Sequence, residues 1–307
     1  MKLTLQHCST MRQKILVIVG PTASGKSALA VQLARALNGE IISADSRQVY
    51  RGLNIGTGKI TKQEMEKVRH HLLDVASPKK IFTAQDFIEK GHAAISKIAA
   101  RGKLPIIVGG TGFYIDALLG RIRLPNVPPN TKLRARLEKK SVVQLFTLLK
   151  RRDPRRAKTI EPHHKRRIIR ALEIAHTLGK NPKPQMNTPY DAMWIGIALP
   201  MKKLEQNIAA RLFARMKGGM VAEAKCLHKS GLSYKRMEGL GLEYRSLARY
   251  LQGKITREQI AEELQRDIRR YAKHQIKYWK RNPEIKWFQE SASAFRYTKS
   301  LTDKGSL

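Results

Sequence analysis

The sequence predicts an α/β fold in which helices flank a parallel sheet and an all-helical basic domain is inserted into that core. Short β-branched apolar runs alternate with helical stretches over the first 124 residues, and this alternation is typical of a parallel sheet. A GxxxxGK(S/T) motif between the first expected strand and the first expected helix indicates a phosphate-binding loop, or P-loop. A basic segment without strand signal then follows.

The expected strands are continuous apolar runs, a pattern typical of strands that are buried on both faces. They cover residues 14–19 (KILVIV), 41–43 and 105–108. Helical spacing covers residues 28–37 and 84–100. After the basic segment, residues 194–199 (WIGIAL) return to a strand pattern.

Composition divides the chain into four parts. Prolines at 125, 128 and 129 end the first part of the core, and residues 131–185 hold 17 Lys and Arg against 4 Asp and Glu. The end of the chain lacks periodicity, and Met11 can serve as a first residue as well as Met1. We therefore expect an N-terminal extension over 1–10, a catalytic core over 11–124 and 191–290, an inserted helical domain over 125–190, and a flexible tail over 291–307.

The last helix of the core is expected to be two-faced. Thr256 and Gln259 form a capping box that opens it, and Pro283 prevents it from continuing. Residues spaced by three and four share one helix face. The basic face comprises Arg266, Arg270, Lys273, Lys277 and Lys280, and the opposite face comprises Ile268, Ala272, Gln275 and Trp279.

The charge balance predicts a polyanionic partner. The chain has 60 Lys and Arg against 24 Asp and Glu, a net charge of +36, and such an excess favours nucleic acid first and an anionic membrane surface second. General Lys enrichment in a high-pI proteome is the alternative explanation of the charge.

The composition of the chain also excludes some classes of protein. Its 42% hydrophobic residues exclude wholesale disorder. No apolar run approaches the roughly 18–20 residues of a membrane span, and two cysteines offer no CxxC spacing. We expect a cytoplasmic monomer without membrane association.

The P-loop motif carries the most specific chemistry. Its glycines let backbone N–H groups converge on phosphate oxygens, its lysine neutralises phosphate charge, and its serine hydroxyl is a candidate Mg²⁺ ligand. The motif alone fits a kinase, an ATPase or another user of diphosphate. Its residues are Gly20, Pro21, Thr22, Ala23, Ser24, Gly25, Lys26 and Ser27.

Two further segments follow strands and are expected to line the same crevice. Asp45 comes after the second strand, where ligands bind in open α/β sheets. There it can hold Mg²⁺ through water, act as a general base, or only cap the following turn. Thr111, in GGTGFY (109–114), brings a hydroxyl to the third wall of the pocket.

Together these motifs resemble the tRNA dimethylallyltransferases, also called tRNA isopentenyltransferases. GPTASGKS at 20–27, DSxQxY at 45–50, Gly56-Thr57, HLLD at 71–74 and GGTGFY at 109–114 occur in family order. RIIRALE at 167–173, GLGLEYR at 239–245 and KHQIKYW at 273–279 match further on. The resemblance covers residues 12–290. One departure is Leu242, which stands where many members have a glycine.

The resemblance implies transfer of a dimethylallyl group from dimethylallyl diphosphate to the N6 amine of the adenosine 3′-adjacent to the anticodon in tRNA. It makes Asp45, Thr111 and Lys26 catalytic. Asp45 takes the amine proton, Thr111 hydrogen-bonds the bridging or leaving oxygen, and Lys26 with Mg²⁺ on Ser27 neutralises the diphosphate. Arg211 adds a second cation for the diphosphate.

The resemblance also places several segments against the tRNA anticodon stem-loop. The charge pattern agrees for the insertion and the last helix, whereas the segment around Leu240 carries little charge. The implied tRNA-binding residues are Asp45, Ser46, Arg47, Gln48, Thr111, Arg134, Arg166, Arg167, Ile168, Ile169, Arg170, Leu240, Gly241, Leu242, Glu243, Tyr244, Arg245, Lys273, His274, Gln275, Ile276, Lys277, Tyr278, Trp279 and Lys280.

Two other functions remain open from the residues alone. One is an isopentenyltransferase acting on free adenine nucleotide, which has no need of a basic helical insertion. The other is a P-loop RNA-binding NTPase, for which the sequence shows no clear run of four apolar residues ending in Asp that is independent of Asp45.

Overall fold

A six-stranded parallel sheet forms the centre of the computed structural model, which describes residues 12–182 and 188–303. The strand order is β3-β2-β4-β1-β5-β6, and each neighbouring pair is parallel. The predicted fold class is therefore confirmed. The strands are β1 (Gln13–Val19), β2 (Gly39–Ser43), β3 (His70–His71), β4 (Leu104–Gly109), β5 (Tyr190–Ile197) and β6 (Lys286–Phe288).

Both faces of the sheet are buried, which explains why its strands are continuous apolar runs. In β1 the odd residues Ile15 and Val17 belong to an apolar cluster with helix α2 (Ala84–Ala99) and helix α3 (Gly112–Leu118). The even residues Leu16 and Ile18 belong to a second cluster with helix α1 (Lys26–Ala36). The alternation of a strand's side chains thus builds two core layers from one run.

Strands β3 and β6 were not predicted from the sequence. Each is very short, and each lies at an edge of the sheet, where it has one neighbour. A run of two or three residues has no recognisable period, so only pairing with β2 or β5 identifies it.

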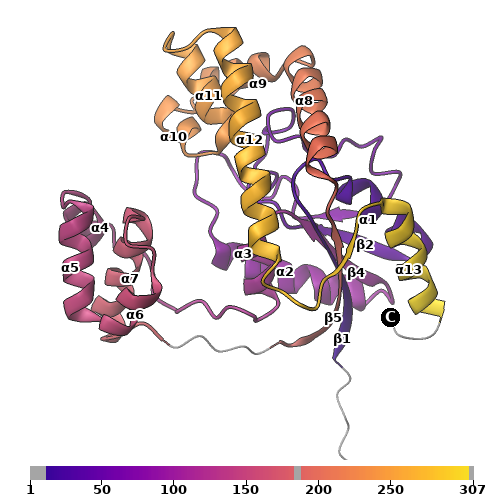
Figure 1. Cartoon of the computed structure of the whole chain (residues 1–307), viewed down its shortest axis with the longest axis horizontal. Helices are drawn as coiled ribbons and strands as arrows, with labels where there is room; N and C mark the ends of the chain where they lie inside the picture. Colours follow the sequence, from indigo (N-terminus) through magenta and orange to yellow (C-terminus); the bar gives the residue numbers. More distant parts are fainter. Residues whose placement is uncertain (1–11, 183–187, 304–307) are drawn as a thin grey trace, which may run out of the picture. The chain divides into compact units, whose positions relative to one another are not determined.

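A group of helices packs over its own apolar cluster in the second half of the chain (Figure 1). Its longest member, α12, starts at a capping box formed by Thr256 and Gln259, as predicted. Residues Ile268, Ala272, Gln275 and Trp279 are its buried face. The group comprises α8 (Met201–Lys217), α9 (Met220–Lys229), α10 (Tyr234–Glu238), α11 (Leu242–Leu251) and α12 (Arg257–Trp279).

The chain divides into two compact units, one from Met1–Gly120 with Thr188–Leu307 and the other from Arg121–Asn187. The second unit has its own core around Leu145, Leu149 and Ile168. The expected domain boundaries at 125 and 190 differ from these by a few residues. Its helices are α4 (Thr131–Glu138), α5 (Val142–Arg152), α6 (Pro154–Thr159) and α7 (Lys165–Leu178).

The flexible tail expected from residue 291 is wrong over most of its length. Residues Ser291–Asp303 form helix α13, in which Ala294 and Thr298 are fully buried. The helix packs against α1, and Ser291 lies next to Gly25 of the P-loop. Because most of its small apolar and aromatic positions are only half-buried, the segment has no continuous apolar stripe, and the sequence pattern did not predict a helix. The expected extension 1–10 and residues 304–307 lie outside the described residues.

Within the ranges 12–182 and 188–303, no helix combines the length and apolarity needed to cross a bilayer.

We expect the variant Ala294→Asp to lower the free energy of unfolding by about 2–4 kcal/mol, because it buries a carboxylate without a partner. Urea denaturation measures this change. Ala292→Asp is the matched control, since Ala292 is exposed on the same helix. Equal stabilities of the two variants would show that α13 is not docked on the sheet.

Candidate active site

Three backbone turns meet at the carboxyl edge of the sheet. Val19 of β1 is in register with Gly109 of β4, and Ser43 of β2 is in register with Val108. The turns that follow these strands therefore start side by side. This edge is where open parallel sheets bind their ligands.

The P-loop wraps from β1 into the first turn of α1. Gly20 has a φ of 153°, and a Cβ there would stand 2.6 Å from the backbone oxygen of Ile197, so only glycine fits. Ala23 and Gly25 also have positive φ, at 62° and 87°. This backbone directs N–H groups and the α1 N-terminus toward one concavity, which suits an anion.

Lys26 is the central cation of this turn. Its Nζ donates a hydrogen bond to the backbone oxygen of Pro21 at 3.0 Å. Burial lowers its pKa and the neighbouring charge of Arg211, from α8, lowers it further, whereas Asp45 raises it; the result is a pKa of about 8. Burial and Arg215 likewise lower the pKa of Arg211. Cations held close enough for one to lower the pKa of another are suited to a strongly anionic ligand.

Asp45 and Thr111 lie together, as the strand order requires. Thr111 N–H donates to the backbone oxygen of Ala44, and Thr111 Oγ accepts from Ser46 N–H at 3.1 Å. Asp45 Oδ1 accepts the backbone N–H groups of Arg47 at 2.8 Å and Gln48 at 3.3 Å. Asp45 therefore caps its turn through one oxygen, while its other oxygen is available to a substrate.

Helix α12 closes the site with two side chains on one face. Tyr271, which is 41% exposed, lies near Thr111, Asp45 and Arg47. Desolvation and Asp45 raise the pKa of the Tyr271 phenol to about 12, against the lowering effect of Arg47 and Thr111. One turn later, the Gln275 amide contacts both the P-loop and the Gly110 turn. The phenol thus remains a neutral hydroxyl beside Asp45 at ordinary pH.

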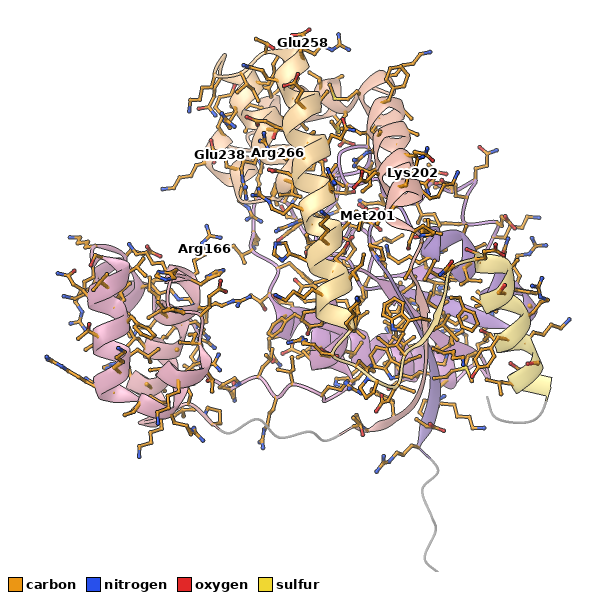
Figure 2. The ribbon with its side chains drawn as sticks, viewed as in Figure 1. Arg166, Met201, Lys202, Glu238, Glu258 and Arg266 are labelled. Atoms are coloured by element: carbon orange, nitrogen blue, oxygen red, sulfur yellow. The ribbon has the colours of Figure 1, made fainter. Side chains whose placement is uncertain are left out.

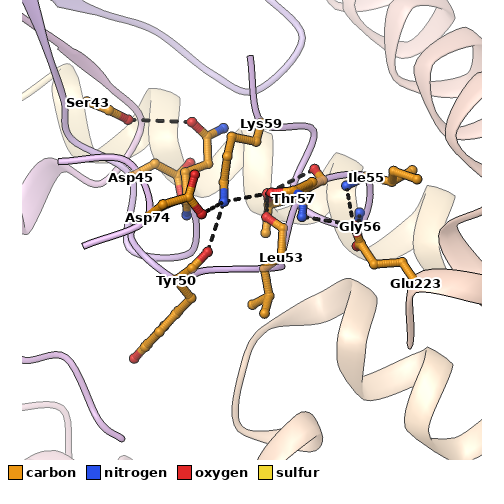
Figure 3. Close-up of polar contacts among 12 residues, drawn as sticks. Ser43, Asp45, Tyr50, Leu53, Ile55, Gly56, Thr57, Lys59, Asp74 and Glu223 are labelled. Carbon is orange, nitrogen blue, oxygen red and sulfur yellow. Dashed lines mark hydrogen bonds and ion pairs between the residues drawn. The ribbon is translucent and has the colours of Figure 1, made fainter. Parts of the chain in front are cut away.

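The loop at residues 54–59 (NIGTGK) is anchored by one carboxylate (Figure 3). Glu223 of α9 accepts backbone N–H groups from Asn54, Ile55 and Gly56 at 2.8–3.0 Å, and it also accepts the Tyr244 hydroxyl at 2.6 Å. A carboxylate with four donors is strongly held. The loop is consequently fixed on the helical group.

Lys59 fixes the other end of the same loop (Figure 3). Its Nζ, which is nearly buried, donates to Tyr50 O, to Asn54 Oδ1 and to Asp74 Oδ1, the last at 2.6 Å. Asp74 ends the HLLD motif, so the two motifs meet here. Their role is to shape the loop that lies against Arg211, whose guanidinium approaches Gly58.

The segment Leu240–Arg245, expected to contact tRNA, contains structural residues. Leu240 and Tyr244 are buried, with 0% and 1% exposure. Glu243 pairs with Arg215 at 3.2 Å. Gly241 carries the positive φ of the turn, 126°, and Leu242 simply begins α11. Leu242 therefore needs no glycine conformation, and the side chains of Leu240 and Tyr244 are not exposed for RNA in this structure.

The segment 273–280 of α12 is also mixed. Lys273, His274, Lys277 and Lys280 are exposed, whereas Gln275 and Trp279 are buried. Ile276 is half-buried, and the Tyr278 hydroxyl donates to Asp116 at 2.5 Å. Only the exposed cations and His274 lie on an accessible face.

In the inserted unit, Arg134 and Arg170 share the buried carboxylate of Glu173. Burial raises the pKa of Glu173, but hydrogen bonds from both arginines and from Asn130 N–H outweigh it and lower the pKa to about 2. Ile168 and Ile169 were also expected to contact tRNA, but their side chains are buried in the core of this unit and do not form its surface.

Arg166 and Arg167 stand on the exposed face of α7. Arg166 projects from the surface of its helix (Figure 2). Arg167 pairs with Glu161 at 3.2 Å, and both side chains are about 60% exposed. Such a pair contributes little to stability, so Arg167 remains accessible to an anion.

The residues around the P-loop fit a metal that arrives with a phosphate ligand. Ser27 is exposed on the first turn of α1, where its hydroxyl is a suitable oxygen ligand for Mg²⁺. Among the described residues, no cluster of three or more His, Cys, Asp and Glu could hold a metal alone. The remaining ligands of Mg²⁺ would therefore come from diphosphate and water.

Three site residues were missed by sequence reasoning: Tyr271, Arg215 and Glu223. Tyr271 precedes Gln275 by four residues on the predicted helix, so helical periodicity was a usable signal. Arg215 and Glu223 reach the site only through tertiary contacts with Gly56 and its neighbours. No local pattern marks such residues.

The parallel sheet, the P-loop and the converging turns define a P-loop α/β protein with a backbone concavity that suits a phosphate group. The IPP transferase family profile matches residues 48–282. The tRNA dimethylallyltransferase of Leuconostoc citreum is 40% identical over 289 residues, which cover 94% of this chain and 98% of the relative. The chain belongs to the IPP transferase family, which confirms the resemblance seen in its motifs.

Solved structures agree with this assignment. The full-length tRNA isopentenylpyrophosphate transferase from Bacillus halodurans matches with a TM-score of 0.73 and 34% identity, over 96% of this chain and 98% of that one. A eukaryotic dimethylallyltransferase acting on tRNA matches with a TM-score of 0.76 and 29% identity, over 87% of this chain and 70% of that one.

Binding of inorganic pyrophosphate should weaken above a pH of about 8, where Lys26 loses its proton. Each further pH unit costs up to about tenfold in affinity, because the ligand favours the charged form. Calorimetric titrations from about pH 7 to about pH 9.5 measure this loss. Lys26→Arg should lack the decline, since arginine does not titrate there. Identical pH profiles for the natural protein and Lys26→Met would exclude Lys26 as the titrating group.

The variant Tyr244→Phe should lower the free energy of unfolding by about 1.5–3 kcal/mol, since it removes a buried hydrogen bond to the Glu223 carboxylate. Urea denaturation is the measurement, with Tyr250→Phe on the same helix as control. Affinity for tRNA should change by less than about twofold. Unchanged stability together with weaker tRNA binding would make Tyr244 an RNA contact instead.

Proposed function

We propose that this protein is a tRNA dimethylallyltransferase: it transfers a dimethylallyl group from dimethylallyl diphosphate to the N6 amine of the adenosine 3′-adjacent to the anticodon, releasing diphosphate. The observation that carries the proposal is the meeting of a carboxylate and a hydroxyl, Asp45 and Thr111, beside a P-loop whose lysine is desolvated. Family membership supports the substrate pair.

The leaving group is diphosphate, and the cations are arranged for it. Charge grows on the diphosphate as the allylic C–O bond breaks, so fixed positive groups stabilise the transition state more than the ground state. Lys26, Arg211 and the P-loop N–H groups supply that charge, and Thr111 is placed to donate to the departing oxygen. Mg²⁺, held by Ser27 and the diphosphate, would supply further neutralisation.

The nucleophile is an exocyclic amine whose lone pair is delocalised into the adenine ring. Positioning and removal of its proton therefore both matter. Asp45 has one oxygen fixed by the Arg47 and Gln48 N–H groups, which orients the other toward the amine. The target base must leave its stack to reach this site. The neutral Tyr271 hydroxyl completes the wall on that side.

Exposed cations supply the RNA-binding surfaces. On α12 and its C-cap these are Arg266, Arg270, Lys273, Lys277 and Lys280, of which Arg266 and Arg270 are both paired with Asp267 (Figure 2 labels Arg266). On the inserted unit they include Arg166 and Arg167. Contacts of this kind position a nucleic acid through its phosphates without reading its bases. A cytoplasmic location and a monomeric state remain predictions from the sequence.

The experiment that tests the function is transfer of a labelled dimethylallyl group from the diphosphate, in the presence of Mg²⁺, to unmodified tRNA, AMP or ATP. Label in tRNA alone is the expected result. Label in free nucleotide would keep the chemistry and change the acceptor. Absence of any transfer by folded protein would leave an RNA-binding P-loop protein.

The variant Asp45→Asn should lower the rate of transfer by about 10²–10⁴-fold, the usual contribution of a general base. Its affinity for tRNA should stay within a few-fold, because the amide oxygen can still accept the turn's hydrogen bonds. Asp191→Asn, at the amino end of β5, is the matched control with unchanged turnover. Turnover of Asp45→Asn close to that of the control would remove Asp45 from proton transfer.

A further inference from the structure

The Gln275 side chain links two loops of the site from within the protein. It is 6% exposed, and both of its amide atoms are used. Its Oε1 accepts the backbone N–H of Thr22 at 2.8 Å, and its Nε2 donates to the backbone oxygen of Gly110 at 3.0 Å. One planar group thus joins the P-loop to the turn that precedes Thr111.

The turn after β4 is shaped to receive this amide. A Cβ on Gly110 would stand 2.0 Å from Gln275 Nε2, and the three nearest atoms to that position all belong to Gln275. Gly110 has no positive φ. The backbone there would accept alanine, and only the glutamine excludes it.

Two neighbours on the same helix face reinforce the link. The Tyr278 ring lies against Gly112, and its hydroxyl donates to Asp116 of α3. Tyr271 lies beside Thr111. Helix α12 therefore places three side chains against the GGTG turn at residues 109–112, and of these three only Gln275 also bonds the P-loop.

We propose that Gln275 is a positioning residue for diphosphate and not a contact to RNA. Its amide sets the separation between the P-loop and the Gly110 turn, and hence between Lys26 and Thr111, which act on the same leaving group. The proposal rests on the proposed function, because it assigns a role within that reaction.

The hydrogen-bond pattern gives the physical reason. Thr22 N–H is already taken by Gln275, so this donor orients the loop instead of binding phosphate. Without the glutamine, a partly buried N–H and a buried backbone oxygen each lose their partner. The loops would then relax to satisfy these groups, and the anion site would lose its preorganisation.

The first variant is Gln275→Met, which keeps the length of the side chain and removes both hydrogen bonds. We expect affinity for inorganic pyrophosphate to fall by about tenfold, the effect of one well-placed hydrogen bond. The KM for the allylic diphosphate should rise and kcat should fall, while affinity for tRNA stays within about twofold. Lys273→Met, exposed two residues earlier, should show the reverse pattern.

A second pair of variants isolates the contact. Gly110→Ala should reproduce the loss of pyrophosphate affinity, because its methyl group displaces the amide. In Gln275→Ala the same methyl group has room, so adding Gly110→Ala should cost less than about twofold more. This non-additivity is the signature of two residues that act through one contact.

The outcomes separate cleanly. If Gln275→Met retains pyrophosphate affinity and loses tRNA affinity, Gln275 is an RNA contact and the proposal is overturned. Additive losses in the Gly110 cycle also overturn it. Pyrophosphate binding requires no transfer reaction, so these results stand even if the natural protein modifies no tRNA. Thermal unfolding of every variant shows whether a loss is local or reflects a chain that does not fold.

Discussion

The hydrogen-bonded junction of the β2 and β4 turns is the constraint on which the rest of the site depends. Ala44 N–H donates to Val108 O, Thr111 N–H donates to Ala44 O, and Ser46 N–H donates to Thr111 Oγ. This chain of bonds extends the parallel ladder past the ends of its strands. These bonds keep Asp45 and Thr111 close together. The P-loop lies beside them because it follows β1, which pairs with β4.

Charge is the second organising factor, and it is distributed in two ways. At the P-loop, cations lie close to one another under partial burial, which lowers the pKa values of Lys26 and Arg211. In the inserted unit, the buried Glu173 carboxylate forms ion pairs with Arg134 and Arg170, so these two arginines have a structural role. The net charge of +36 therefore overstates the binding surface. The cations that count are those left unneutralised at the phosphate site or exposed on α7 and α12.

The sequence was sufficient for the sheet, the P-loop and the Asp45–Thr111 pair because each follows from a local pattern plus the rule that parallel strands end at one edge. It was insufficient for α13 and β6, whose short or weakly periodic segments are defined by what they pack against. It also gave no sign that Ile168, Ile169, Leu240 and Tyr244 are buried. These residues lie in segments implied to contact RNA, but a motif includes residues that support a surface as well as residues that form it. Burial, which only tertiary structure reveals, distinguishes the two.

Helix α12 shows how one motif serves both purposes. Its period places Tyr271, Gln275 and Tyr278 toward the turns of the catalytic edge, and Lys273, Lys277 and Lys280 toward solvent. Substitution on either face would impair modification of tRNA, so loss of activity alone does not tell which ligand a residue serves. Because Gln275 is satisfied on both sides by backbone groups, a helix that moved as RNA bound would have to break those bonds. The geometry therefore favours a rigid α12 that presents its cations on a site already formed, in which RNA affinity and diphosphate affinity are separable properties of opposite faces.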